Sequence, residues 1–293
     1  MDKYSLNMKL ECGEENNKRL LEISSDSEYK LLEVEGLESS DYDVNISSNS
    51  QYDGGILDSK KISSRSITFS AEYTGRDNIS KERDGLISFF NPKKTGVLIV
   101  DCGSGARKIS YEVESFKIKQ SNINDPLGFL VTLICPDPYF EDINDLQEII
   151  AVWSGGLEFD FSLPLSFKTR NSGESGGVSK EVIVGGHVET PLEIEFEGPA
   201  EQPKVTNVTT GEFITVNQTL KENEILYINT AYGNKKVKII TNKGEKNAFN
   251  YIDLNSTFFS LIPGKNTIEY TNSNATLTEQ NVCIKYKNKY LGI

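Results

Sequence analysis

The sequence has few of the residues on which most enzyme and metal sites depend. Its 293 residues include one histidine, one tryptophan and four cysteines. A single histidine, His187, excludes metal sites built on several histidines. No catalytic cysteine motif accompanies it. We therefore expect His187 to lie at a strand end or on the surface.

The four cysteines form no Cys-x-x-Cys pair, so neither a zinc site nor a disulfide framework is predicted. Three of them lie in or beside apolar runs typical of strands, which predicts small buried hydrophobic side chains. These are Cys12, Cys135 and Cys283. Free thiols fit synthesis in a reducing cytoplasm.

Long apolar runs and excess positive charge are also missing. No run of about 20 apolar residues could span a bilayer, and residues 1–10 lack the features of a signal peptide. The formal net charge is −12, which gives nucleic-acid binding little electrostatic basis. The short basic clusters at 93–94 and 285–289 are interpreted as solvated surfaces.

The first half of the chain is rich in strand patterns. Residues 67–73 alternate between apolar and polar side chains, the period of a half-buried strand. Residues 97–113 read as a hairpin around the turn 102–105, with a bulge expected near Glu114 and Ser115. One short helix is predicted over 81–90, capped by Ser80.

A break near the middle predicts two domains. The apolar run 129–135 ends at two prolines, which cannot continue a sheet ladder. We expect a domain over 1–140, a linker over 141–154 and a second domain over 155–293. The residues predicted to fix this junction are Pro136, Asp137, Pro138, Tyr139 and Phe140.

The second half predicts a β-sandwich or jelly roll. Residues 157–163 and 192–196 alternate, and the glutamates of the latter run, Glu193, Glu195 and Glu197, are interpreted as one water-facing side of a strand. Short strands separated by Gly, Asn and Pro turns follow. They are expected at 213–216, 225–228, 236–240, 258–262 and 267–270.

Motifs for nucleotide or acid–base chemistry are incomplete. Gly103-x-Gly105 lacks the third glycine and the following helix of a dinucleotide fingerprint. Gly264-Lys265 lacks the remaining elements of a phosphate-binding loop. The acidic pairs match no EF-hand spacing. The sequence therefore predicts no enzyme, no catalytic residues, no metal site and no cofactor.

Several short motifs occur in an order that resembles the phage distal tail protein family, siphophage tail components, over nearly the whole chain. The first half contributes Tyr52-Asp53-Gly54-Gly55, Ser64-Arg65, Phe89-Phe90-Asn91-Pro92-Lys93, Gly96-Val97-Leu98, 112–116 and Cys135-Pro136-Asp137-Pro138-Tyr139-Phe140. The second half contributes Asn171-Ser172-Gly173, Gly198-Pro199-Ala200, 207–212 and 256–268. The second half shows no long inserted arm of the kind that some members use to hold receptor-binding proteins.

The resemblance implies an all-β, mainly antiparallel fold. It implies an N-terminal β-sandwich or barrel-like domain with one short helix, followed by a jelly-roll or galectin-like sandwich. It also implies a structural baseplate protein of a phage or prophage virion, made in the bacterial cytoplasm. Such proteins form a homo-hexameric ring between the tail tube protein and the tail-associated hub protein. Asp53, Gly54 and Gly55 are expected in a loop at that ring.

A carbohydrate-binding module that contributes to host-surface adhesion is the alternative function. Tyr227, Tyr232 and Tyr251 are the candidate sugar-stacking residues. A receptor-binding protein and host cell-wall polysaccharide are further candidate partners. Neither nucleic acid nor membrane insertion is expected. A glycan hydrolase is a third hypothesis, but no pair of acidic residues lies in a recognisable catalytic context. The residues leave contractile and non-contractile tails both open.

Overall fold

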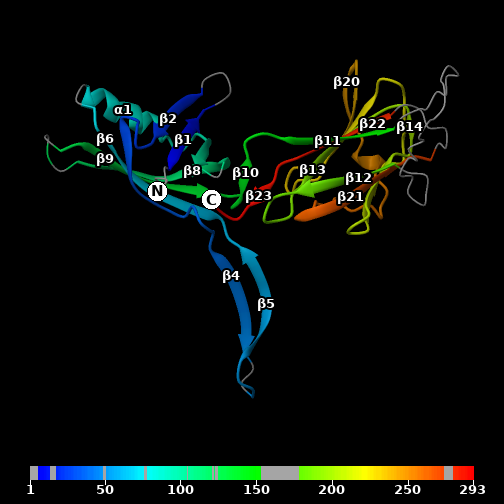
Figure 1. The fold of residues 1–293 in the computed structure, drawn as a ribbon, viewed down its shortest axis with the longest axis horizontal. Coiled ribbons are helices and arrows are strands. Elements are labelled where there is room, and N and C mark those ends of the chain that lie inside the picture. Colours follow the sequence, from blue (N-terminus) through cyan, green and yellow to red (C-terminus); the bar gives the residue numbers. More distant parts are fainter. Residues whose placement is uncertain are drawn as a thin grey trace, which may run out of the picture. The chain divides into compact units, whose positions relative to one another are not determined.

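The structure, a computed structural model, divides the chain into two compact units. Unit 1 comprises residues 1–143 with 289–293, and unit 2 comprises 144–288. The described residues are 6–13, 18–48, 51–75, 78–103, 105–120, 122, 125–152, 178–273 and 280–293. The strand predicted at 157–163 and the motif Asn171-Ser172-Gly173 lie outside them. The described chain is nearly all β, as predicted (Figure 1).

Unit 1 is built around a sheet that closes on itself. Its order is β8-β7-β1-β2-β3-β6-β9, and β9 pairs again with β8. The closure works because β8 is 14 residues long and carries a register shift between Val113 and Ser115, which bends it so that it serves two neighbours. This confirms the bulge predicted near Glu114 and Ser115. The strands are β1 (Asn7–Cys12), β2 (Arg19–Ile23), β3 (Tyr29–Glu35), β6 (Arg65–Tyr73), β7 (Gly96–Asp101), β8 (Ala106–Lys119) and β9 (Leu127–Cys135), with β10 (Phe140–Asp142) and β23 (Lys289–Tyr290) added beside β8.

The strand patterns explain this core. In β9 the side chains alternate strictly between buried and half-buried, from Leu127 to Cys135, and the strand ends at Cys135 as the two prolines predict. β6 alternates in the same way over most of its length. The apolar halves of these patterns meet in one cluster of buried residues. Burial of such side chains supplies the main favourable term in folding.

The single α-helix of the described residues, α1 (Ile79–Phe89), begins two residues before the predicted start. The predicted cap was wrong: Ser80 lies within the first turn. Asn78 occupies the capping position with a φ of 57° and makes no side-chain capping bond. Asparagine tolerates this left-handed conformation better than most residues, so the chain enters the helix earlier. At the other end, Phe90 stacks on Phe116 of β8 with ring centroids 5.0 Å apart.

Unit 2 is a sandwich of two antiparallel sheets that share one core. The six-stranded sheet has the order β11-β22-β13-β18-β19-β20, and the four-stranded sheet has the order β12-β21-β15-β16. Phe196 and Tyr270, from opposite sheets, lie with ring centroids 5.6 Å apart in this core. The strands are β11 (Leu146–Val152), β12 (Val178–Val184), β13 (Leu192–Glu197), β14 (Ala200–Glu201), β15 (Lys204–Asn207), β16 (Glu212–Thr215), β17 (Thr219–Leu220), β18 (Ile225–Asn229), β19 (Lys236–Thr241), β20 (Gly244–Asn247), β21 (Gly264–Thr271) and β22 (Gln280–Tyr286), with a short 3-10 helix η2 (Phe249–Tyr251).

The boundary between the units differs in detail from the predicted one. Residues 141–154 were expected as a linker, but β10 and β11 occupy most of them. Phe140 is fully buried in the core of unit 1, and Ile150 is buried in that of unit 2. The last five residues return to unit 1, where β23 pairs with β10. The chain therefore passes between the units twice.

Two buried asparagines organise a pair of turns in unit 2. Asn207 and Asn266 are both fully buried, and Asn207 Nδ2 donates to Asn266 Oδ1 at 3.2 Å. Asn266 also accepts from the N–H of Ile262 at 3.0 Å and donates to its carbonyl at 2.7 Å. The backbone of Ile262 therefore bonds to a side chain instead of a strand. This explains why 258–262, predicted as a strand, forms only an isolated bridge at Leu261.

We predict that Asn266→Ala lowers the free energy of unfolding of unit 2 by about 3 kcal/mol, because it leaves buried backbone groups of Ile262 without partners. Hydrogen exchange measured by mass spectrometry should show faster exchange in β15 and β21, with unit 1 unchanged. Asn234→Ala, in an exposed turn of the same unit, is the matched control. Equal effects of the two substitutions would contradict the role given to the buried pair.

Candidate functional site: an exposed arm and a buried arginine

A two-stranded arm leaves the barrel of unit 1 between β3 and β6. It consists of β4 (Tyr42–Ser48) and β5 (Gly55–Ile62), which pair only with each other and form a separate ribbon in Figure 1. Most strands of the barrel pair along their length with a neighbour on each side, but β2 and β3 meet only at Ile23 and Tyr29 and keep open edges beyond that pair. The arm lies outside the barrel, and each of its strands has one side without a neighbouring strand.

One face of the arm is mainly apolar and the other is mainly polar. Tyr42, Val44 and Ile46 alternate along β4, and Ile46 lies opposite Leu57 on β5. Their side chains are exposed: 64% for Ile46 and 57% for Leu57. The other face carries polar pairs, with Lys61 Nζ 3.2 Å from a carboxylate oxygen of Asp43. An isolated two-stranded hairpin is marginally stable in water, and an exposed apolar face of this kind is typical of an interaction surface.

The predicted ring-loop residues lie at the tip of this arm. Asp53 and Gly54 belong to the turn, and Gly55 begins β5. Gly54 has a φ of 94°, which a side chain would strain. The apolar face behind the tip was missed at the sequence level. The alternation of Tyr42, Val44 and Ile46 could have revealed it.

A buried arginine clamps the root of the arm. Arg65, the first residue of β6, is 1% exposed. Its Nη1 donates to the carbonyl of Gly36, on the other side of the arm, at 2.7 Å. The close approach requires glycine there, because a Cβ at Gly36 would lie 2.1 Å from the carbonyl oxygen of Ser66. The arm at 37–64 is thus held at both of its ends.

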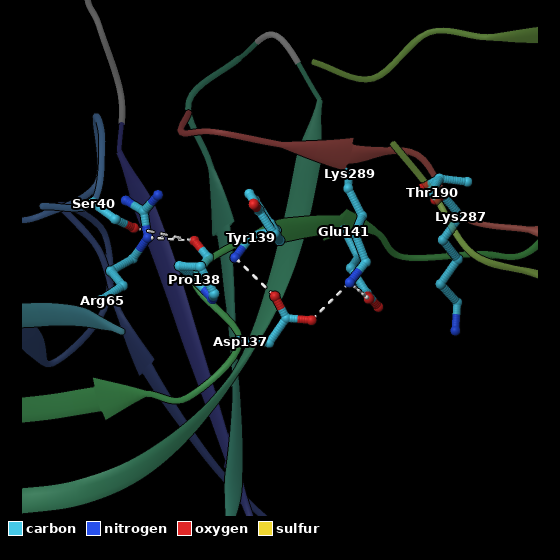
Figure 2. Close-up of polar contacts among 9 residues, drawn as sticks. All are labelled: Ser40, Arg65, Asp137, Pro138, Tyr139, Glu141, Thr190, Lys287 and Lys289. Carbon is cyan, nitrogen blue, oxygen red and sulfur yellow. Dashed lines mark hydrogen bonds and ion pairs between the residues drawn. The ribbon is translucent and has the colours of Figure 1, made fainter. Parts of the chain in front are cut away.

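The same guanidinium binds two other segments of unit 1. Its Nε donates to the carbonyl of Pro138 at 2.8 Å, and its Nη2 donates to the carbonyl of Leu291. Figure 2 shows the side chains of Arg65 and Ser40 both directed at the Pro138 carbonyl. Burial lowers the pKa of Arg65, but guanidinium remains charged in proteins. Carbonyl dipoles and the face of the Phe140 ring, 4.9 Å away, compensate for the charge.

Lys289 fastens the C-terminal tail to the predicted junction block. Its Nζ lies 2.7 Å from Asp137 Oδ2 and 3.6 Å from Glu141 Oε1, and it sits 5.4 Å from the centroid of the Tyr139 ring (Figure 2). The block from Pro136 to Phe140 therefore lies within unit 1, three residues before the chain enters unit 2.

The other residues singled out from the sequence do not assemble into a reaction centre. His187 is exposed in a bend after β12, and Glu195 pairs with Lys285 at 2.8 Å on the outer face of the six-stranded sheet. Among the residues that the structure describes, no cluster of three or more potential metal ligands is present. No helix of this part of the chain has the length and apolarity to cross a membrane.

The cysteines and the candidate sugar-stacking tyrosines are dispersed. Cys12 and Cys135 are buried, whereas Cys102 and Cys283 are half-buried. Burial raises the pKa of Cys135 to about 12. The tyrosines come from three elements: Tyr227 from β18, Tyr232 from an exposed turn, and Tyr251 from η2.

The comparisons with known proteins agree with this architecture. Residues 185–290 match the family model described as siphovirus-type tail component, C-terminal domain. The crystal structure of SPP1 Dit (gp 19.1), described as a paradigm of the hub adsorption apparatus in Gram-positive infecting phages, has a TM-score of 0.67 at 11% identity. The alignment covers 98% of this chain and 99% of that one. The chain therefore has the fold of a Dit protein, and its residues 185–290 match the siphovirus-type tail component domain.

A second solved structure supports the same fold. The phage P2 baseplate in its activated conformation with Ca contains a chain with a TM-score of 0.53 at 12% identity, aligned over 98% of this chain and 99% of that one. No curated protein sequence matches. The family-model match contains both turns held by Asn207 and Asn266. The turn motifs of the matched region therefore have a physical basis in the buried pair.

We predict that Arg65→Met lowers the free energy of unfolding of unit 1 by about 3 kcal/mol or more, because three partly buried carbonyls lose the hydrogen bonds that Arg65 donates. Arg65→Lys should recover only part of the loss, since an ammonium cannot reproduce the planar fork. Hydrogen exchange in β6 and β9 reports the effect, and unit 2 serves as the internal reference.

Arg83→Met, at an exposed position of α1, is the control for the loss of one positive charge. The anchoring role fails if Arg83→Met accelerates exchange in β6 and β9 as strongly as Arg65→Met.

Proposed function

We propose that this protein is a structural subunit of a phage baseplate that assembles into a homo-hexameric ring. In this proposal the ring connects the tail tube protein to the tail-associated hub protein, and the protein resides in the virion. The observation that carries the proposal is the amphipathic arm, on a chain whose fold matches tail-hub and baseplate proteins over its full length.

The arm suits contact with a second copy of the chain. A hairpin with one exposed apolar face gains stability when that face is covered. Identical subunits that bind through two different surfaces form a ring when the rotation closes. We infer that the apolar face of each arm packs on the barrel of the neighbouring subunit, with Asp53, Gly54 and Gly55 at the contact. Such an obligate interface should bury on the order of 2,000 Å² or more.

The clamp at the arm's root supports this role. Arg65 fixes the two chain segments from which the arm departs, so the arm leaves the barrel from a rigid base. A contact surface on a fixed base loses less conformational freedom on assembly than a surface on a loose loop. In the proposal, the block 136–140 fixes the end of unit 1 next to the first passage between units.

The alternative, a carbohydrate-binding module, is less well supported at the predicted tyrosines. Lys238 Nζ lies 5.2 Å from the ring centroid of Tyr227, and Lys246 Nζ lies 5.6 Å from that of Tyr251. A lysine therefore occupies one face of each ring. A neutral sugar would have to displace it before stacking there.

Native mass spectrometry tests the ring with a matched pair of variants. The unmodified chain should give a six-fold species, and Ile46→Glu should give monomers, because it places a charge on the apolar face. Ile56→Glu makes the same chemical change on the opposite face of the arm, where the side chain is 73% exposed. It should preserve the ring.

A persistent monomer of the unmodified chain at tens of micromolar would count against self-assembly. A hexamer formed equally well by Ile46→Glu would show that the ring uses another surface. Comparison of the two glutamate variants separates these outcomes from a general effect of added charge.

A further inference from the structure

The edge of the six-stranded sheet in unit 2 carries a hollow that the assembly role does not use. It has a volume of about 290 Å³ and lies over β19, β20 and the start of η2. The side chains that matter for its chemistry are Lys235, Lys236, Lys238, Lys246, Asn247 and Phe249. We call this hollow the lysine pocket.

The lysine pocket is positively charged, although the chain as a whole is negatively charged. The segment 235–246 contains five lysines and one acidic residue, whereas the whole chain has a net charge of −12. The acidic residue, Glu245, pairs with Lys238 at 2.8 Å. Lys235, Lys236 and Lys246 form no ion pair within the part of the chain that the structure describes. Their positive charges are therefore available to a ligand.

Aromatic rings hold the ammonium groups in place and supply an apolar wall. Lys235 Nζ lies 5.1 Å from the ring centroid of Phe258, which stacks on Phe249 at 5.7 Å with an interplanar angle of 15°. Phe249 is itself 44% exposed and lines the pocket. Cation–π contacts of this kind restrict lysine side chains that would otherwise move freely in water. A solvated lysine run on a flat strand would show neither the hollow nor the rings.

We propose that the lysine pocket binds an anionic sugar unit, one that carries a phosphate or a carboxylate. The ammonium groups of Lys235 and Lys236 bind the anion, and a sugar ring packs against the exposed part of Phe249. The Asn247 amide and the free oxygen of Glu245 offer hydrogen bonds to hydroxyl groups. The volume lies just below the range of drug-sized sites, which suits one sugar unit better than a protein segment.

Titration of the full-length protein with small probes tests this assignment. Glucose 6-phosphate and glucuronate are the two anionic sugars, and glucose, inorganic phosphate and a short glutamate-rich peptide are the comparison ligands. NMR chemical shifts of β19 and β20 amides report binding. At least one anionic sugar should bind ten-fold or more tightly than glucose, and tighter than phosphate. The sugar that binds more tightly shows whether the pocket prefers a phosphate or a carboxylate. Added salt should weaken binding of either sugar.

Three variants locate the site. Lys235→Ala with Lys236→Ala should weaken binding of the anionic sugar ten-fold or more. Phe249→Ala should weaken it while leaving the affinity for inorganic phosphate within two-fold. Lys243→Ala removes a charge from the same hairpin at a position that does not line the pocket. It should leave sugar binding within two-fold.

Four results would overturn the proposal: no binding of either anionic sugar, equal binding of glucose, a preference for the peptide, or a loss with Lys243→Ala as large as with the double variant. Shifts of amides in unit 1 verify that each variant remains folded. The test is independent of ring formation, because every probe can be measured on monomer or ring.

Discussion

The hydrogen bonds of one buried guanidinium determine how unit 1 is put together. Arg65 donates to carbonyl oxygens of Gly36, Pro138 and Leu291, which come from three distant parts of the chain. None of these partners is a carboxylate, so the charge rests on backbone dipoles that are already fixed by the fold. Removing the arginine would take one donor from each of these partly buried oxygens, which costs more than the net value of the bonds wherever no other donor replaces it. The root of the arm, the end of β9 and the returning C-terminus thus depend on one side chain.

This clamp relates the closed barrel to the exposed arm. Closure pairs most strand edges of the barrel, except along β2 and β3, which meet only at Ile23 and Tyr29. The arm adds two further open edges outside the barrel, and its alternation gives it a side that favours contact with protein. Arg65 bonds across the base of the arm, so the barrel fixes the position from which the arm and its apolar face extend. Unit 1 therefore keeps its stable core in the barrel and its surface for assembly on the arm.

Much of the fold could be predicted from the sequence because its signals are local. The strict alternation of β9, the two prolines that end it and the bulge in β8 all depend on neighbouring residues. The helix start depended on the backbone of Asn78, and the loss of a strand at 258–262 depended on a side chain four residues beyond it, at Asn266. In the sequence, Arg65 stood out only as part of the Ser64-Arg65 motif. Its role requires carbonyls up to 226 residues away, and no local pattern encodes such a contact.

The charged surface of unit 2 shows the same difference between what local sequence patterns predict and which residues meet in the fold. Alternation alone predicted that Glu193, Glu195 and Glu197 line one side of a strand, but it could not reveal their partners. In the sheet, Lys285 pairs with Glu195 and Lys238 pairs with Glu245, so two acidic residues lie beside ammonium groups instead of converging on a metal. The lysines left over from this pairing gather at the outer edge, against aromatic rings contributed by η2 and the segment after it. Local neutralisation within the sheet thus concentrates the unpaired positive charge at its edge, although the chain as a whole is strongly acidic.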